Sequence, residues 1–360
     1  MQLAYRVFDL PLKHVFRISR GATSVQPTFI VQLSHDAQHG YGEATTNRYY
    51  NATAAAMAAA MESVRELIES ADPMQPRSLL DRVAGELGGE NQFALAALDL
   101  ALHDLYGKLK GQPLYQLWGW NLEQVPESNY TIGIDTIDCM VAKLNEMPGW
   151  PVYKIKLGTD DDLAIIRELR KHTSAAFRVD ANCGWTVEQT IRYAPPMKEL
   201  GVEFIEQPLS AADREGAAEA RNGSVLPIIA DESCVIEDDV QHCIGRFDGI
   251  NIKLTKCGGM APARRMIDQA KSAGMKVMMG CMTESSVGIS AIAQFLPVLD
   301  YVDMDGAVLI AGDIADGAKV IQGHCHFPSG NGTGVSLHEG PLATDCRQIE
   351  STANEIETQT

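Results

Sequence analysis

The 360-residue sequence predicts an α/β protein, namely a (β/α)7β barrel of the TIM type with an N-terminal α+β capping domain completed by the C-terminal segment. Eight short apolar runs recur about every two dozen residues from about residue 126 onward. Amphipathic helix-like stretches, such as residues 162–173 and 262–274, separate the runs. Such alternation is typical of a parallel sheet covered by helices, and eight units most simply close into a barrel. A doubly wound open sheet is the alternative, but no GxGxxG fingerprint follows a first strand.

The capping domain is predicted over residues 1–125, where the alternation is missing. The segments "LAYRVFDLPL", "FIVQLSHD" and "GYGEA" resemble strands of an antiparallel meander, and Ala-rich helix-like segments follow them. The barrel with the catalytic site is predicted over residues 126–314, and residues 315–345 are expected to return to the capping domain. Residues 346–360 are polar and predict a loosely held tail.

The predicted barrel strands all end close to a polar residue. They are "NYTIGI" (129–134), "VYKIKL" (152–157), "FRVD" (177–180), "EFIEQ" (203–207), "PIIAD" (227–231), "GINIK" (249–253), "VMMGCM" (277–282) and "YVDMDG" (301–306).

Composition narrows the class of partner. The formal net charge of −17 disfavours nucleic acid and anionic membrane surfaces, because no basic surplus exists to neutralise phosphates. The first residues contain no apolar run of signal-peptide or membrane-span length. Eight cysteines occur without CxxC pairs, as expected for reduced thiols. We therefore expect a cytoplasmic protein acting on a small molecule.

Charged side chains mark the predicted strand ends: Lys154, Lys156, Asp180, Glu206, Asp231, Lys253, Asp303 and Asp305. In a barrel these ends meet at one mouth, which is where barrel enzymes carry their chemistry. Three carboxylates on neighbouring strands, at 180, 206 and 231, would repel one another unless they share a cation. Oxygen ligands suit a hard divalent ion, Mg²⁺ first and Mn²⁺ second.

The lysines suggest proton transfer. Lys154 and Lys156 lie on one face of their strand, because side chains alternate along a strand. Lys253 ends a strand on the far side of the barrel, so Lys156 and Lys253 could face the two sides of one bound carbon. The neighbouring ammonium of Lys154 should lower the proton affinity of Lys156, as a general base requires.

The sequence also contains three other candidate sites for a metal ion or an anion. Four cysteines close to strand ends could form a soft Zn²⁺ site, although the spacings are those of the barrel: Cys183, Cys234, Cys257 and Cys281. His324 and His326 in "GHCHF" could form a metal clip. "CGGM" at a helix start could hold a phosphate, but no P-loop pattern accompanies it.

Five motifs in order, "YKIKLG", "VDANCGW", "IEQPL", "ADES" and "INIKLTKCGG", resemble the enolase superfamily in its muconate-lactonising-enzyme subgroup. The resemblance implies one Mg²⁺ per subunit on the three carboxylates, with Lys156 and Lys253 as the acid/base pair. It also implies that Lys154 supports the substrate carboxylate, that Asn182 lies near the metal, and that Glu284 lines the site.

The eighth strand is similar to the DxD of the dipeptide epimerase family, whose two carboxylates hold the substrate's α-ammonium group. Asp303 and Asp305 match that pattern, and "FRISRG" and "GCMTE" are also similar. The resemblance implies 1,1-proton transfer at the α-carbon of a dipeptide's C-terminal residue, through an enediolate.

One segment departs from the Ala-Glu epimerases of this family, which present an arginine from the loop after "ISRG". Here that loop, "GATSVQP" (21–27), has no basic residue beyond Arg20, which could equally form a structural salt bridge. A small or apolar side chain at the epimerised residue is therefore at least as well supported as an acidic one. Thr23 in this loop is a candidate substrate contact. The cap loop, about residues 17–27, and the loop near "TTNRYY" (45–50) are expected to close the mouth.

An N-acylamino acid racemase, or a lyase of the subgroup such as a cycloisomerase or o-succinylbenzoate synthase, would use the same metal and lysines. Neither needs a pocket for an ammonium group. A protein that only binds ligands is disfavoured, because binding alone needs no base on each face. Relatives are commonly oligomers, so a homo-oligomer is expected by analogy.

Overall fold

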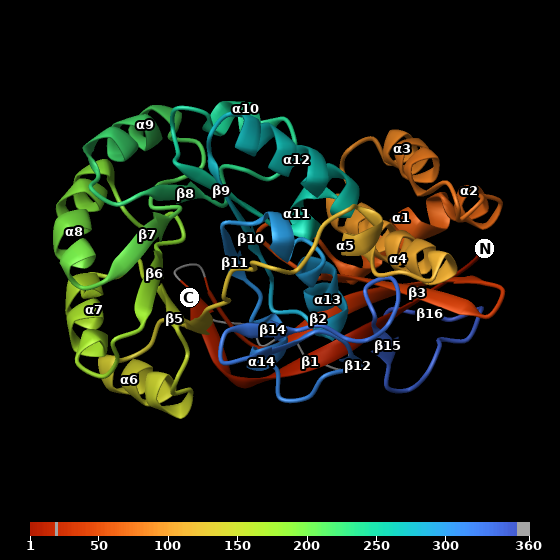
Figure 1. Cartoon of the computed structure of the whole chain (residues 1–360), viewed down its shortest axis with the longest axis horizontal. Coiled ribbons are helices and arrows are strands. Elements are labelled where there is room, and N and C mark those ends of the chain that lie inside the picture. Colours follow the sequence, from red (N-terminus) through yellow and green to blue (C-terminus); the bar gives the residue numbers. More distant parts are fainter. Residues whose placement is uncertain (19–20, 351–360) are drawn as a thin grey trace.

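The computed structural model describes residues 1–18 and 21–350. Figure 1 shows two parts: a barrel ringed by helices, and a cap built from the N-terminal strands and helices. Eight parallel strands form one sheet in the order β11-β10-β9-β8-β7-β6-β5-β4. Their bounds are β4 (Tyr130–Ile132), β5 (Val152–Lys156), β6 (Ala176–Asp180), β7 (Val202–Glu206), β8 (Ile228–Ala230), β9 (Gly249–Ile252), β10 (Lys276–Gly280) and β11 (Tyr301–Asp303).

Helices follow the barrel strands and cover the sheet from outside. They are α6 (Ile137–Glu146), α7 (Asp162–Arg170), α8 (Val187–Glu199), α9 (Arg214–Gly223), α10 (Asp239–Cys243), α11 (Leu254–Cys257), α12 (Met260–Ser272), α13 (Ser286–Ala293) and α14 (Gly306–Leu309). A short 3₁₀ turn (Leu296–Val298) lies between α13 and β11.

The sheet closes between its first and last strands. Ser128 forms a parallel bridge with Val302, and its Oγ accepts the backbone N–H of Met304 at 3.0 Å. Asn129 Nδ2 donates to Asp303 Oδ1 at 2.8 Å across the same seam. The predicted barrel and its eight strands are confirmed.

Strand β5 illustrates why the chain folds in this way. Its five residues are all buried. Tyr153 and Ile155 pack in an apolar cluster with Leu144 of α6 and Ile165 of α7. The alternating lysines of β5 therefore face the barrel interior, where only charged partners can compensate for their burial.

The cap is an antiparallel sheet of β1 (Gln2–Ile18), β2 (Gly21–His35) and β3 (Gln38–Thr45), with helices packed on it. The helices are α1 (Ala54–Ser63), α2 (Arg65–Glu69), α3 (Pro76–Leu87), α4 (Gln92–Lys110) and α5 (Leu114–Leu117). Helix α4 lies so close to β3 that a Cβ at Gly42 would come within 2.0 Å of the Ala97 carbonyl oxygen. Only glycine permits this approach.

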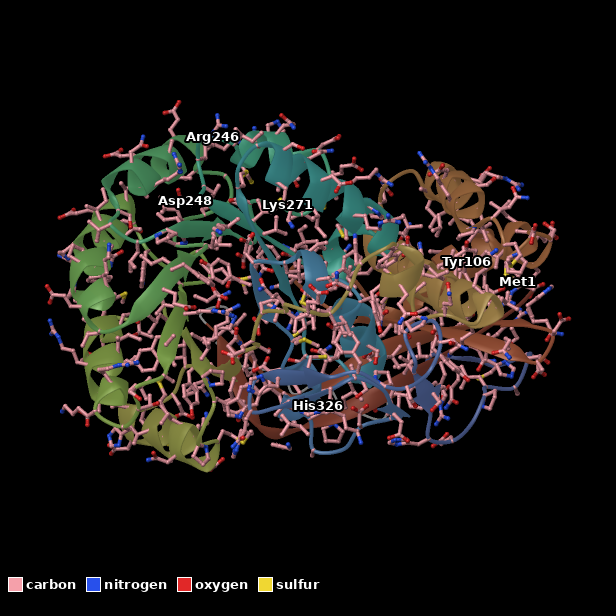
Figure 2. The ribbon with its side chains drawn as sticks, in the orientation of Figure 1. Met1, Tyr106, Arg246, Asp248, Lys271 and His326 are labelled. Carbon is pink, nitrogen blue, oxygen red and sulfur yellow. The ribbon has the colours of Figure 1, made fainter. Side chains whose placement is uncertain are left out.

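The C-terminal segment contacts both parts, which differs from a simple return to the cap. Strands β13 (Lys319–Ile321) and β14 (His324–His326) form a hairpin, and Gly323 O in its turn accepts Ser128 N at 2.8 Å. The hairpin therefore lies against the start of the first barrel strand. Its last residue, His326, is labelled in Figure 2. Strand β12 (Ala315–Asp316) pairs with β15 (Ser336–Leu337).

The remaining C-terminal residues do reach the cap. Thr333 donates to Asp104 Oδ1 at 2.8 Å and Leu342 N donates to Gln32 Oε1 at 2.7 Å. Strand β16 (Arg347–Gln348) pairs in parallel with β1, so the segment expected to be a polar tail begins with an ordered strand. It satisfies backbone groups at an edge of the cap sheet. The domain limits themselves stay a prediction.

In the part of the chain that the structure describes, no helix combines the length and the apolar character that crossing a membrane would require.

Candidate active site at the barrel mouth

Three carboxylates meet at the carboxyl ends of neighbouring strands. Asp180 ends β6, Glu206 ends β7 and Asp231 follows β8; Asp180 is paired in register with Glu206. Each offers an oxygen within 4.8 Å of the others, and none is more than 2% exposed. The structure thus brings together the carboxylates that the sequence placed at strand ends.

Burial and charge act differently on the three acids. Burial raises the pKa of Glu206 to about 7, and Asp180 and Asp231 add to this while Lys154 opposes it. Burial also favours a higher pKa for Asp180 and Asp231, but neighbouring lysines outweigh it. The pKa of Asp180 is lowered by Lys156 and Lys154, and that of Asp231 lies well below its usual range beside Lys253 and Lys256.

The carboxylate cluster fits a hard divalent cation. Glu206 Oε2 is buried, lies 2.8 Å from Lys154 Nζ, and still receives no hydrogen bond of acceptable geometry. Crowded carboxylates with an open oxygen lone pair are the donor set that Mg²⁺ prefers. Asp180, Glu206 and Asp231 could therefore hold such an ion.

Two amines flank this cluster from opposite ends. Lys156 Nζ lies 2.6 Å from Asp180 Oδ2, and Lys253 Nζ lies 2.7 Å from Asp231 Oδ2. Their strands, β5 and β9, are separated by three strands in the sheet. Burial would lower the pKa of Lys253, but the adjacent Asp231 carboxylate raises it above its usual range.

Lys154 forms more ion pairs with carboxylates than the sequence suggested. It is fully buried and lies 2.7 Å from Asp303, 2.8 Å from Glu206 and 3.3 Å from Asp180. Burial would lower its pKa, but the three carboxylates raise it well above the ordinary value. It therefore remains charged, while its expected role toward a substrate carboxylate stays a prediction.

Asp303 and Asp305 are not equivalent. Asp303 Oδ2 pairs with Lys154, Oδ1 accepts from Asn129, and the lysines outweigh burial so that its pKa falls to about 2. Asp305 Oδ2 accepts the backbone N–H of Thr131 at 2.5 Å, and no lysine, arginine or histidine in the described ranges forms an ion pair with it. Burial, together with Asp303, raises the pKa of Asp305 to about 8.

The other expected site residues lie at varied distances from this centre. The backbone N–H of Asn182, in the left-handed region at φ 45°, donates to Asp180 Oδ1 at 2.9 Å. Glu284 is 4% exposed, and burial followed by Glu43 raises its pKa well above the usual value. The hydroxyl of Thr23 donates to Val25 O at 2.7 Å within the cap.

The segment expected as a loop over residues 17–27 is mostly strand, which corrects that expectation. Strand β1 continues to Ile18 and β2 starts at Gly21, because each supplies backbone partners to the other. This β1–β2 arm rests on the barrel mouth: Ile134 N donates to Arg17 O at 2.9 Å, and Ala311 N to Pro11 O at 2.7 Å. Arg20 lies outside the described residues.

The second expected mouth segment also contacts the barrel. Asn47 Nδ2 lies 3.9 Å from Met282 Sδ, which follows β10. Tyr50 is close enough to Lys253 and Lys256 for their charges to act on its hydroxyl, although burial dominates and raises its pKa to about 12. The sequence predicted this segment at the mouth but did not single out Tyr50.

Lys256 is the main residue that sequence reasoning missed. It is fully buried, and its Nζ donates to Asp231 Oδ1 and to Asp231 O, both at 2.6 Å. Lys253 and Lys256 are one turn apart around α11, so one carboxylate receives both amines. The spacing "KLTK" before a helix was the available signal.

The alternative metal and anion sites do not form as proposed. The four cysteines do not gather: Cys257 Sγ, for example, contacts the backbone oxygens of Leu254 and Gly259. His324 and His326 belong to no metal-like cluster of the described residues. At "CGGM", the N–H groups of Met260 and Ala261 already donate to the Asp99 carboxylate of α4, which leaves no place for phosphate.

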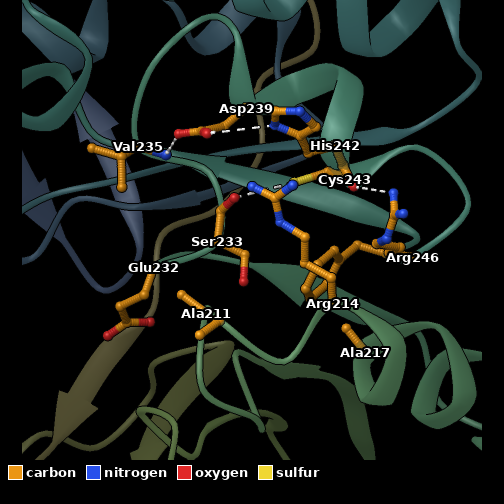
Figure 3. Close-up of a pocket in the computed structure, with 12 residues that line it drawn as sticks. Ala211, Arg214, Ala217, Glu232, Ser233, Val235, Asp239, His242, Cys243 and Arg246 are labelled. Atoms are coloured by element: carbon orange, nitrogen blue, oxygen red, sulfur yellow. Dashed lines mark hydrogen bonds and ion pairs between the residues drawn. The ribbon is translucent and has the colours of Figure 1, made fainter.

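A separate cavity of about 340 Å³ lies beside the mouth, between the segments that follow β7 and β8 and the helices α9 and α10 (Figure 3). It touches neither the carboxylate cluster nor its lysines. Its lining includes Arg214, Glu232, Ser233, His242 and Arg246.

Barrel, cap and carboxylate cluster together define a class of protein that sequence comparison identifies. Residues 140–340 match the family described as "Enolase C-terminal domain-like". Residues 3–119 match "Mandelate racemase / muconate lactonizing enzyme, N-terminal domain". The chain therefore belongs to the enolase superfamily, in its mandelate racemase and muconate lactonizing enzyme group.

Individual relatives narrow the class further. The chain is 56% identical over 340 residues to an L-Ala-D/L-amino acid epimerase of Maribacter sp., covering 94% of this chain and 100% of the relative. It is 52% identical to an enzyme of the same name from Flavobacterium johnsoniae, covering 94% and 100%. A dipeptide epimerase from Enterococcus faecalis, solved with Mg and the dipeptide L-Leu-L-Tyr, superposes with TM-score 0.88 at 28% identity, covering 93% and 99%. The family expected from the sequence motifs is confirmed, and the chain is an enzyme of the isomerase class.

Proposed function

We propose that the protein is a dipeptide epimerase that inverts the α-carbon of the C-terminal residue by 1,1-proton transfer. The observation that carries this proposal is the placement of Lys156 and Lys253 at opposite ends of the carboxylate cluster, 2.6 and 2.7 Å from Asp180 and Asp231. Inversion requires one group to remove hydrogen from one face of the carbon and another to return it to the opposite face. The names of the relatives support the same activity.

Each charged residue then has a defined task. One of Lys156 and Lys253 accepts the α-proton, and the other donates one from the opposite side. Electrons left on the α-carbon move into the substrate carboxylate, which becomes an enediolate. Lys154, held charged by three acids, lies where it can oppose that negative charge.

Asp180, Glu206 and Asp231 would hold one divalent ion per subunit, with Mg²⁺ preferred and Mn²⁺ as the second choice. When bound, the ion would supply positive charge for the carboxylate in which charge develops.

The amino end of the substrate is assigned to Asp305, with Asp303 beside it. Asp305 is a buried carboxylate without a described cationic partner, and a dipeptide would bring it an ammonium group. Binding at that end would orient the reacting carbon between the two lysines. Muconate and succinylbenzoate have no such group, which disfavours the lyases.

Side-chain preference is assigned to the mouth. Thr23 on the β1–β2 arm, Asn182 and Glu284 are proposed to contact the substrate, and the arm lacks a basic residue over 21–27. A small or apolar side chain at the epimerised residue fits this arm. A cytoplasmic location and homo-oligomeric assembly stay predictions.

The test is to incubate a dipeptide library with the enzyme and Mg²⁺ in deuterated water and read the label at each residue by mass spectrometry. Active dipeptides should gain deuterium at the C-terminal α-carbon alone. Lys156→Ala and Lys253→Ala should each abolish epimerisation, while each leaves exchange for one stereoisomer. Lys276→Ala removes an exposed lysine paired with Asp300 and serves as the matched control. Full turnover by either site variant would disprove the two-base scheme.

An N-acylamino acid racemase is the second candidate, because Asp303 is already paired with Lys154 and only Asp305 remains open. The two functions differ in the effect of Asp305→Asn. A dipeptide epimerase should show a raised KM for dipeptides and little change for N-acylamino acids. A racemase should show the reverse.

A further inference from the structure

A second cluster of metal-ligating atoms lies at the mouth in the described part of the chain. Cys281 Sγ and one oxygen each of Asp303 and Asp305 all lie within 4.8 Å of one another. Strands β10 and β11 bring them together: Gly280 pairs in register with Asp303, so Cys281 leaves β10 beside the two acids. The thiol lies 3.9 Å from Asp305 Oδ1.

The two acids of the cluster differ, because Asp303 is paired with a lysine and Asp305 lies near no described cation. Lys154 offsets Asp303 at 2.7 Å, but it also serves Glu206 and Asp180. Asp305 is 2% exposed and has no ion pair within the described ranges. A buried carboxylate without a cation is kept neutral by a proton, and a metal ion can take the place of that proton.

Its donor set differs from that of the first cluster. Three carboxylates suit Mg²⁺, whereas a sulfur with two carboxylate oxygens suits a softer ion. Zn²⁺ accepts thiolate and carboxylate ligands together and often keeps a further position for water or substrate. Cd²⁺, softer still, is a suitable probe of the same ligands.

We propose that Cys281, Asp303 and Asp305 form a second metal site, selective for Zn²⁺ or Cd²⁺ over Mg²⁺, that overlaps the place of the substrate's ammonium group. The ion forms a bond to Sγ and to one oxygen each of Asp303 and Asp305, as the thiol and the Asp305 carboxyl each release a proton to solvent. Asp303 can keep Lys154, because a carboxylate offers about four lone-pair positions. Micronutrient zinc would then inhibit the enzyme; this consequence rests on the proposed function, whereas the site itself does not.

A structural role for Cys281 is the competing explanation. Cysteine is a frequent small filler of buried space, and Cys281 packs at the edge of the barrel's apolar cluster. A filler would bind no ion and could be replaced by serine without effect on metal binding. The two explanations therefore differ in a direct measurement.

The binding experiment titrates Cd²⁺ into the full-length protein in excess Mg²⁺, so that the all-oxygen cluster is saturated. Ultraviolet charge-transfer absorption from thiolate to Cd²⁺ should rise to one ion per chain. Cys281→Ser should remove it, and Asp305→Asn should weaken Cd²⁺ binding by roughly 10–100-fold. Cys325→Ser, at another partly buried cysteine, is the matched control and should leave the signal intact. An unchanged signal in Cys281→Ser would overturn the proposal.

A second measurement covers the case in which Cys281→Ser folds poorly. Stoichiometric Cd²⁺ should protect Cys281 of the unaltered protein from iodoacetamide, as read by peptide mass spectrometry, while exposed Cys139 stays reactive. Equal alkylation of Cys281 with and without Cd²⁺ would refute the site.

The inhibition experiment separates the site from the proposed function. Zn²⁺ should raise KM for the dipeptide without lowering kcat, and Cys281→Ser should abolish the effect. Absence of dipeptide turnover would remove the proposed function and leave the Cd²⁺ result as the decision on the site. Charge-transfer binding without competition would overturn the overlap with the ammonium position.

Discussion

Asp231 and Asp305 are both buried acids at the barrel mouth, yet their surroundings are opposite. Asp231 receives Lys253 at 2.7 Å and Lys256 at 2.6 Å, while Asp305 has a single backbone donor and no described cation. Burial raises the pKa of both, but the lysines reverse the effect at Asp231, whereas burial and Asp303 leave Asp305 at about 8. The charge partner, rather than depth, decides which carboxylate is ionised and which is left for an incoming cation.

The largest expected difference between Asp231 and Asp305 is the effect of their substitution on the free energy of unfolding. Asp231→Asn should lower the free energy of unfolding by roughly 3 to 5 kcal/mol, because it leaves two buried amines without their shared partner. Asp305→Asn should change stability little, because at pH 7 the Asp305 carboxyl already holds a proton and no cation is left unpaired by the substitution. Urea unfolding of the metal-free proteins measures both changes. Equal losses in the two variants would break the comparison.

Removal of Lys256 should show how far Asp231 depends on its second amine. Lys256→Met should lower Mg²⁺ affinity by roughly 10–100-fold, because Asp231 loses the group that fixes its orientation. Isothermal titration with Mg²⁺ gives the affinity, and Lys276→Met supplies a lysine control remote from the mouth. An unaltered affinity would show that Lys253 alone positions the carboxylate.

The pH dependence of stability should report Asp305 directly. Its pKa rises from 3.8 to about 8 on folding, so the folded state binds the proton more tightly. This contribution is complete below about pH 4, is lost as pH rises toward 8, and is constant above. Relative to Asp305→Asn, the unaltered protein should therefore lose stability across that window. If urea unfolding showed the same change of stability with pH for both proteins, the assignment of this titration to Asp305 would be wrong.

The smallest effect is expected at Thr23 on the β1–β2 arm. Thr23→Ala removes a hydroxyl bonded within the cap, so stability should change by about 0.5 kcal/mol or less. If the arm contributes to side-chain preference, the ratio of KM values for apolar and acidic dipeptides should shift by less than about tenfold. A ratio equal to that of the unaltered enzyme would remove Thr23 from the substrate contacts.

Local rules were sufficient for the barrel and its charged strand ends. Alternation within β5 predicted that Lys154 and Lys156 share a face, and the parallel arrangement predicted that Asp180, Glu206 and Asp231 meet. These inferences need only side-chain period and strand direction, both of which are local.

Long-range closure explains what the sequence could not predict. Asp303 and Asp305 differ because β11 meets β4 and the residue before it: Asn129 donates to one acid and the Thr131 backbone to the other. The helix α11 is too short to show a periodic sequence pattern, so the sequence did not predict that Lys256 would be buried at the site. Residues 21–27 became strand because they pair with β1, a contact that the composition of the segment alone does not indicate.

The parallel pairing of β16 with β1 also orders events during synthesis. Strand β1 leaves the ribosome before the barrel strands, but its partner at residues 347–348 emerges only after all of them. Since domains tend to fold as they emerge, the cap sheet must wait with one edge open while eight barrel strands assemble. The cap sheet is therefore completed last, after the barrel beneath it has formed.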